Sequence, residues 1–268
     1  GKQCAFALRS IGYKVIEIDA KNDVLSELKK NIYTIPKQPD LIPYITSYYK
    51  ERWGFCMSQK QFDALKEANY KVKIDSKLER GYLSYADMII PGKSKKEILF
   101  NTNICHPALA NNETSGIVVL AFLGEYLSRI STNYSYRITF VPETIGALTY
   151  IKKNFINLKT NLLFGFNCVC VGDNKNFSIL KSKNINSSSE FFAFKTLKMM
   201  NVKYKVYDWL TRGSDERQYS SPNLDFDFCS LMRSKYAQYP EYHTSLDKLG
   251  SVVTEKGLKR SIKCTKFS

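Results

Sequence analysis

The chain has 268 residues, of which 44% are hydrophobic and 24% are charged, and its formal net charge is +15. This length and composition are typical of a large globular fold with a substantial core. Apolar stretches such as Ile117 to Leu123 are far shorter than the ~18 residues that a membrane span needs, so no membrane association is predicted. The N-terminus lacks the pattern of a cleaved signal peptide, and we expect a cytoplasmic protein.

The positive charge comes mainly from lysines dispersed along the chain. Such an excess attracts anionic partners. The sequence shows no basic helix, no row of aromatic residues for stacking bases and no Cys/His finger, so we predict no nucleic-acid binding. Seven cysteines are scattered without a C-x-x-C pair, which favours reduced thiols over disulfides or a zinc knuckle.

The first ninety residues give a mixed pattern. Prolines at 36, 39 and 43 interrupt regular structure there. Periodicity predicts helices within 5–11, around 25–30 and over 58–68, and strands at 13–18, 70–74 and 83–90.

From Glu97 onward, predicted strands alternate with helices. The segment 98–104 is continuously apolar enough to be a central strand, and Ser115 is expected to cap a helix with an apolar stripe from Val118 to Leu127. Further strands are predicted at 136–141, 162–171, 204–207 and 226–232, with helices at 148–155 and 190–200. This alternation predicts a largely parallel sheet between layers of helices, with chemistry at the carboxyl ends of the strands.

Both histidines of the chain lie in polar loops that follow predicted strands. His106 follows the strand at 98–104, His243 follows the strand at 226–232, and Glu143 ends the strand at 136–141. Taken singly, a histidine is more often a packed residue, Glu143 suits a helix N-terminus, and the acidic pair Asp215–Glu216 suits a surface ion-pair turn. We expect these residues to converge on one sheet edge, each at the end of its own strand. Mixed nitrogen and oxygen donors there suit zinc.

Five ordered motifs in the chain are distinctive: Ile104-Cys-His-Pro, Ala110-Asn-Asn-Glu-Thr-Ser-Gly, Pro142-Glu-Thr-Ile-Gly, Arg212-Gly-Ser-Asp-Glu-Arg-Gln-Tyr and Glu241-Tyr-His-Thr-Ser-Leu-Asp. They resemble the bacterial aminopeptidase-like domain family, and the resemblance extends over residues 36–262. Members of that family often occur in polysaccharide-biosynthesis gene clusters and are distant relatives of the zinc-dependent exopeptidases.

The resemblance implies an α/β three-layer sandwich with a mostly parallel central sheet. Residues 1–23 and 91–268 would form this aminopeptidase-like domain, and residues 24–90 a smaller inserted α+β subdomain. The family also carries a longer N-terminal part and a C-terminal winged-helix region, which we expect to be shortened or absent in this chain.

Candidate metal ligands follow from the resemblance residue by residue. It implies His106 as the first and His243 as the last ligand, while Asn112 stands where the zinc aminopeptidases place a metal-bridging aspartate. Glu143 stands at their Glu-Glu pair, and Asp215 at a residue beside the site. Because Asn112 is uncharged and a further aspartate ligand would fall near Val169, we expect one zinc ion or none.

The implied activity is that of a metal-dependent hydrolase acting on a peptide or another small amide near a chain end. Glu143 would be the general base, or Glu216 or Glu241 if Glu143 binds the metal. Tyrosines would line the substrate site and an arginine would bind a carboxylate; the candidates are Tyr236, Tyr239, Tyr242, Arg212, Arg217 and Arg233.

Two other functions remain open. One is a binding protein that keeps the fold with impaired catalysis, and the other is an amide hydrolase acting on a glycan or sugar intermediate of polysaccharide biosynthesis. Cys105 is expected to be a small core residue whose side chain points away from His106, as alternation along a strand would place it.

Overall fold

The computed structural model describes residues 24–46, 53–68, 70, 74, 80–106 and 108–267. The chain divides into two compact units: Gly1–Tyr82 with His243–Asp247, and Leu83–Tyr242 with Lys248–Ser268. The elements predicted within 5–18 and most of the strand predicted at 70–74 lie outside the described residues, and the predicted domain division stays a prediction. No described helix is both long and apolar enough to cross a membrane.

The described residues of the first unit form two short helices and a small sheet, with the bounds α2 (Val24–Lys30), β1 (Ile32–Tyr33), β2 (Phe55–Cys56) and α3 (Gln59–Asp63). β1 and β2 pair in parallel. Ser58 caps α3, as the side chains of Ser58 and Gln61 each accept from the other's backbone N–H. The helix ends at Asp63, earlier than predicted, because none of its residues is buried and tertiary packing does not prolong it.

The second unit is built on a seven-stranded sheet in the order β3-β5-β4-β6-β9-β7-β8. Its strands are β3 (Ala86–Ile90), β4 (Ser94–Asn103), β5 (Tyr134–Val141), β6 (Leu162–Cys168), β7 (Phe177–Leu180), β8 (Tyr204–Tyr207) and β9 (Phe228–Met232). Neighbouring strands are parallel except in the pairs β3–β5 and β7–β9. The predicted, mostly parallel sheet is therefore confirmed, although β7 was not predicted.

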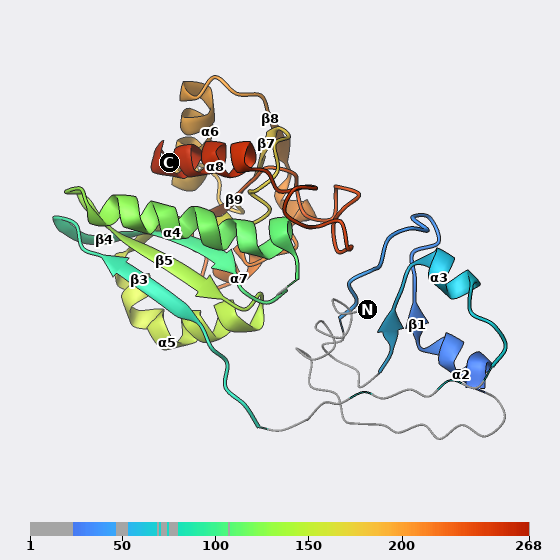
Figure 1. Cartoon of the computed structure of the whole chain (residues 1–268). Coiled ribbons are helices and arrows are strands. Elements are labelled where there is room, and N and C mark those ends of the chain that lie inside the picture. The colour runs from blue at the N-terminus through green and yellow to red at the C-terminus, as the bar shows by residue number, and fades with distance from the viewer. Residues whose placement is uncertain are drawn as a thin grey trace. The chain divides into compact units, whose positions relative to one another are not determined.

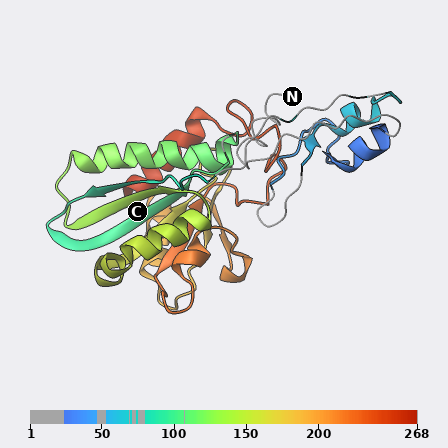
Figure 2. The same ribbon diagram turned by 90° about the horizontal axis from the view of Figure 1, so that it is seen from below.

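Helices cover both faces of this sheet, which confirms the predicted three-layer sandwich (Figures 1 and 2). They are α4 (Ser115–Ser128), α5 (Ile145–Asn161), α6 (Ser188–Met199), α7 (Glu216–Tyr219) and α8 (Glu255–Phe267), with short turns η1 (Ala110–Thr114) and η2 (Trp209–Thr211). α8, absent from the predicted elements, packs beside α4.

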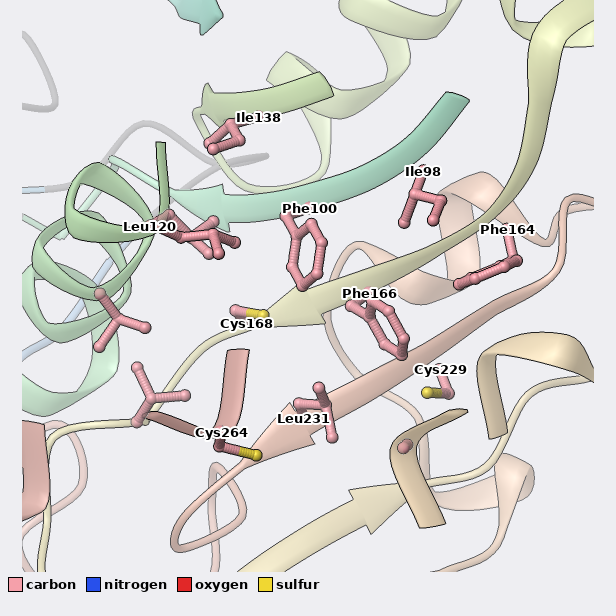
Figure 3. Close-up of a cluster of buried hydrophobic side chains, with 14 of the residues drawn as sticks. Ile98, Phe100, Leu120, Ile138, Phe164, Phe166, Cys168, Cys229, Leu231 and Cys264 are labelled. Atoms are coloured by element: carbon pink, nitrogen blue, oxygen red, sulfur yellow. The ribbon is translucent and has the colours of Figure 1, made fainter. Parts of the chain in front are cut away.

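The continuous apolar run of β4 is explained by its burial on both faces. Ile98 and Phe100 point into a core formed with α4, α6 and α8, whereas Leu99 points into the core formed with α5. Figure 3 shows Phe100 next to Phe166 of β6 in the first of these cores. A strand covered on both sides cannot alternate apolar and polar residues. The rigid sheet edge that ends at Asn103 rests on this packing.

At Gly116, α4 lies close to Thr102 of β4 and to the end of β6. A Cβ atom on Gly116 would lie 2.0 Å from Thr102 Oγ1 and 2.5 Å from the carbonyl oxygen of Cys168. Alanine favours a helix over glycine by about 1 kcal/mol, yet we expect Gly116→Ala to lower the free energy of unfolding by about 1–3 kcal/mol because backbone must move. Urea denaturation followed by circular dichroism measures the change.

Gly124→Ala, in the same helix, is the matched control for this prediction. The nearest atoms there are the ends of the Met88 and Ile138 side chains, which can move. We therefore expect a smaller loss than at Gly116. Equal losses at the two glycines would show that the approach of α4 to β4 is not the constraint.

Candidate metal centre and active site

The carboxyl ends of β4, β5, β6 and β9 lie at one edge of the sheet, because each of these strands runs parallel to its neighbour in the set. His106 follows β4 at this edge, and Glu143 follows β5. Figure 1 shows these two strands side by side. The expectation that Asp215 also ends a strand is wrong. Asp215 is the residue before α7, separated from β8 by the turn η2, and it is fully buried together with Glu216, which excludes a surface turn.

A buried imidazole–carboxylate pair forms the centre of the site. His106 is 3% exposed, and its Nδ1 lies 2.7 Å from Oε1 of Glu113, which is 2% exposed. The Asn112 amide donates to the same oxygen at 2.5 Å, and the backbone N–H of Cys105 donates to Oε2 of Glu113 at 3.0 Å. The carboxylate is therefore held on both oxygens and fixes the orientation of the imidazole.

A π-helical turn brings Glu113 to His106. The backbone N–H of Thr114 bonds to the carbonyl of Leu109, five residues back, at 3.3 Å. This wider turn buries the side chains at positions 111, 112 and 113 together, and such turns are frequent at functional sites. Ser115, predicted to cap α4, instead accepts from Val171 N–H at 3.0 Å and donates to the Asn111 carbonyl. It fastens the turn to the loop after β6.

The prediction that Cys105 points away from His106 is wrong. Its Sγ lies 2.9 Å from His106 Nδ1. β4 ends at Asn103, so the alternation of side chains along a strand no longer applies at position 105. Burial, Glu113 and Glu143 all raise the pKa of the Cys105 thiol, which keeps it protonated and opposes a thiolate ligand.

The donors in this cluster fit a zinc ion. One ligand atom from each of Cys105, His106 and Glu113 lies within 4.8 Å of the other two. Imidazole nitrogen, carboxylate oxygen and sulfur are the ligand types that zinc uses, and buried charged ligands need such a cation or a partner charge. Among the described residues, His106 and Glu113 are the strongest donors, since the thiol is protonated.

Glu143 is positioned by two side chains from different elements. Its Oε1 accepts from the Ser214 hydroxyl at 2.8 Å and from the Asn103 amide at 3.1 Å. Burial is the main cause that raises the pKa of Glu143, and Glu113 adds to it, whereas the Ser214 hydrogen bond and His106 lower it. A carboxyl group with a raised pKa is suited to general acid–base catalysis near neutral pH.

Asp215 fixes the backbone next to Glu143. The Thr144 N–H donates to Oδ1 of Asp215 at 2.7 Å, and the Asn101 amide donates to Oδ2 at 3.1 Å. Thr144 has φ 63°, a conformation that is strained for a β-branched residue and is found mainly at functional sites. Burial raises the pKa of Asp215 well above its usual range, and Glu143 contributes. These contacts favour a positioning role for Asp215 over its predicted role as a metal ligand, which stays a prediction.

Glu216 is the centre of a second buried network. Its oxygens accept hydrogen bonds from the backbone N–H groups of Gly213 and Ser214, the hydroxyls of Tyr236 and Ser230, and the amide of Asn167. Because so many protein donors hold the Glu216 carboxylate, a structural role is favoured over a catalytic one. Its predicted role as a general base is not tested by this geometry.

The three predicted tyrosines do not share one role. Tyr236 donates to Glu216 at 2.9 Å, so it supports that network. Tyr239 and Tyr242 contact each other edge to face, with ring centroids 5.5 Å apart. Burial raises the pKa of Tyr242, followed by Cys170 and then Glu143 and Glu113. The substrate-lining roles of the three tyrosines stay predictions.

The three predicted arginines differ in how exposed their side chains are. Arg212 and Arg217 are exposed, and the guanidinium of Arg212 lies 4.8 Å from the centroid of the Trp209 ring. Arg233 is 1% exposed. Glu241 lies 3.6 Å from the Lys175 ammonium. The substrate-binding roles of the arginines, and the role of Glu241 as a base, stay predictions.

His243 belongs to the first unit, where its ring contacts Tyr44 edge to face with centroids 5.4 Å apart. Its carbonyl accepts from the Tyr44 N–H at 2.8 Å. Its role as a metal ligand stays a prediction.

Glu113, Asn103 and Ser214 were not singled out from the sequence. Glu113 lies in a polar loop ahead of a helix, a position where acidic residues are common for other reasons. The available signal was two consecutive asparagines followed by a glutamate, seven residues after His106. Only the π-helical turn shows that this spacing brings the two side chains together.

Comparisons with known proteins agree with this architecture. The family described as "Domain of unknown function (DUF4910)" matches residues 7–267. A Clostridium acetobutylicum protein described as a polysaccharide biosynthesis protein with an aminopeptidase-like domain is 40% identical over 97% of this chain, which spans 62% of that protein's length. A crystal structure from the same organism, described as a peptidase, has 39% identity and a TM-score of 0.88 over 97% of this chain and 59% of its own. A zinc aminopeptidase from Bacillus subtilis shares the fold, with a TM-score of 0.63 at 14% identity over 92% of this chain and 67% of its own. The predicted resemblance is confirmed, and the chain belongs to the DUF4910 family of aminopeptidase-like proteins.

Proposed function

We propose that the chain is a zinc-dependent hydrolase that cleaves an amide or peptide bond near the end of its substrate. The observation that carries the proposal is the buried His106–Glu113 pair beside Glu143, at the carboxyl edge of an aminopeptidase-like sheet. His106 would be a ligand of the metal, with Glu113 orienting its imidazole and Asn112 next to Glu113. The family resemblance implies His243 as a further ligand. Zinc in such a site supplies a Lewis acid that polarises a carbonyl group and activates water.

The chain's own residues would orient the groups and move the proton. A proton on His106 Nδ1, donated to Glu113, leaves the lone pair on Nε2, the tautomer suited to a metal ligand. Ser214 and Asn103 hold Oε1 of Glu143, which would take a proton from the attacking water. Tyr242 would face the substrate from the side of the acidic cluster.

Zinc content and amide hydrolysis together test the proposal. We expect the purified protein, loaded with zinc and dialysed, to keep about one ion per chain. We also expect zinc-dependent release of product from at least one member of a panel of aminoacyl 4-nitroanilides and N-acylated amino sugars. The amino sugars are included because the Clostridium acetobutylicum relative is named as a polysaccharide biosynthesis protein. A protein that retains no zinc would contradict the proposal.

Loss of the Ser214 hydroxyl is expected to raise the pKa of Glu143. The hydroxyl donates to the carboxylate and stabilises its charged form, so in Ser214→Ala the proton leaves at higher pH. The measurement is a ¹³C NMR titration of the Glu143 carboxyl in metal-free protein, assigned with Glu143→Gln. The rate of hydrolysis should then fall on acidification at a correspondingly higher pH than in the wild type.

Ser220→Ala is the matched control for this titration, since the Ser220 hydroxyl is also buried but donates to the Phe226 carbonyl. Its Glu143 pKa should equal that of the wild type. If the pKa of Glu143 stays the same or falls in Ser214→Ala, the Ser214 hydroxyl does not stabilise the charged form of Glu143.

A second candidate function is a binding protein with the same fold and impaired catalysis. It is favoured by Asn112, an uncharged amide that donates to Glu113 where the zinc aminopeptidases have a bridging carboxylate. The same panel separates the two candidates. Retained zinc without hydrolysis of any amide, under conditions where the fold is intact by circular dichroism, would favour binding.

A further inference from the structure

A small cationic pocket lies where β7, β8 and the loop after β9 meet. Its volume is about 170 Å³, or about five to six times the roughly 30 Å³ that one water occupies in the liquid. Four basic side chains line it and no acidic one does: Lys175, Lys205, Arg233 and Lys235. β7 and β9 are hydrogen-bonded neighbours, as are β7 and β8 (Figure 1), so the pocket stands on paired strands of the sheet.

Arg233 is a buried lining residue of this pocket and lacks acceptors for most of its guanidinium. It is 1% exposed. Its Nη2 donates to the carbonyl of Lys175, but its buried Nε and Nη1 find no hydrogen-bond partner among the described residues. The guanidinium lies 4.1 Å from the centroid of the Phe177 ring. Leaving a buried charged donor unpaired costs free energy that a bound anion would recover.

The nearby carboxylates do not supply the missing acceptors. Asp173 is 1% exposed, and its oxygens accept from the backbone N–H groups of Lys175 and Ser234 and from the Asn111 amide. Glu241 pairs with Lys175. Within the described part of the chain, none of Arg233, Lys205 and Lys235 forms an ion pair.

Burial lowers the pKa of Arg233 to about 10, and Arg260 adds to this, whereas Asp173 opposes it. Burial also lowers the pKa of Lys235, whose ammonium lies 4.1 Å from the Tyr236 ring centroid and 5.6 Å from that of Tyr207. In both groups burial is the cause of the lowered pKa, and the carboxylates of Asp173 and Glu216 act in the opposite direction without reversing it.

We propose that this pocket binds the phosphate group of a small phosphorylated molecule. Three unpaired cations match the charge of about −1.5 to −2 on a phosphate monoester better than the single charge of a carboxylate. The Arg233 donors would meet two phosphate oxygens, and Lys205 at the rim would add charge. Tyr239 lines the pocket and contacts Tyr242 of the candidate site, so the rest of the molecule would lie next to that site. The phosphate assignment does not depend on amide hydrolysis.

Calorimetric titration with inorganic phosphate at low ionic strength tests this proposal. Metal-free protein is used so that phosphate cannot bind to zinc, and His106→Ala is expected to bind phosphate as the wild type does. Arg233→Gln should weaken phosphate binding about tenfold or more, because it removes charge-assisted hydrogen bonds. Acetate should bind at least about tenfold more weakly than phosphate, and equal affinities would overturn the choice of phosphate over carboxylate.

Exposed lysines on the same strand region provide a matched pair in case Arg233→Gln fails to fold. Lys205 and Lys203 are both exposed, but only Lys205 lines the pocket. Lys205→Gln should weaken phosphate binding about two- to fivefold, and Lys203→Gln should leave it unchanged. An absence of phosphate binding to the wild type, or equal effects of the two lysine variants, would overturn the proposal.

Discussion

Replacement of His106 by alanine is expected to abolish zinc retention. The imidazole is the buried nitrogen donor of the cluster, and its orientation is fixed by Glu113. Within the cluster of Cys105, His106 and Glu113, removing it leaves only a carboxylate and a protonated thiol. Plasma mass spectrometry after dialysis measures the zinc content per chain. Titration against a competing chelator measures the zinc affinity. Glu113→Gln should give a smaller loss if Glu113 mainly orients His106, about 10- to 100-fold in affinity.

Cys105→Ala is the control for the His106 variant. It changes the adjacent residue in the same cluster without altering its charge, and we expect zinc to be retained. His243→Ala is expected to lose zinc as His106→Ala does, which tests the ligand implied by the family resemblance. If Cys105→Ala loses zinc while both histidine variants retain it, the metal site is a different one.

Continuous apolar strands and amphipathic helices made most of the second unit predictable. The end of β4, which is buried on both faces, and the bounds of α4, with its apolar stripe, were predicted closely, whereas β4 begins at Ser94, earlier than the predicted Ile98. α8 was not predicted, because its buried residues include the small side chains Gly257, Ser261 and Cys264, which periodicity of large apolar residues does not detect. β7 was missed because four residues are too few for a period-2 pattern.

The site was predictable only as far as it follows strand ends. His106 and Glu143 were found because each follows an apolar strand that the sequence marks clearly. The side chain of Cys105 was misplaced because the strand ends two residues earlier, and Glu113 was missed because it depends on a π-helical turn. Ser214 approaches Glu143 from 71 residues away, a contact that no local pattern encodes.

Glu143→Gln is expected to lower the rate of hydrolysis by about 10²- to 10⁴-fold, the usual contribution of a general base. Glutamine keeps an oxygen that can accept from Ser214 and Asn103, so the site should keep its shape and zinc content should change little. The comparison of kcat at equal zinc occupancy measures the effect. A variant that loses zinc instead would make Glu143 a metal ligand, the other role that its position leaves open.

The same variant should be more stable than the wild type in the metal-free state at neutral pH. The pKa of Glu143 is raised in the folded protein by burial and by Glu113, so the folded state binds this proton more tightly than the unfolded chain, whose glutamate pKa is about 4.3. The stability that this proton contributes is therefore lost as the pH rises from about 4.3 through the raised pKa of Glu143 in the folded protein. Glutamine does not ionise, so the variant avoids this loss. The melting temperature of Glu143→Gln should exceed that of the wild type at pH 7, and the difference should shrink toward low pH, where the wild-type carboxyl is protonated.

Glu125→Gln, at an exposed position of α4 paired with Arg129, should leave the melting temperature nearly unchanged. A Glu143→Gln protein that melts below the wild type at neutral pH would mean that the carboxylate is stabilised by its surroundings, which would argue against its role as a base.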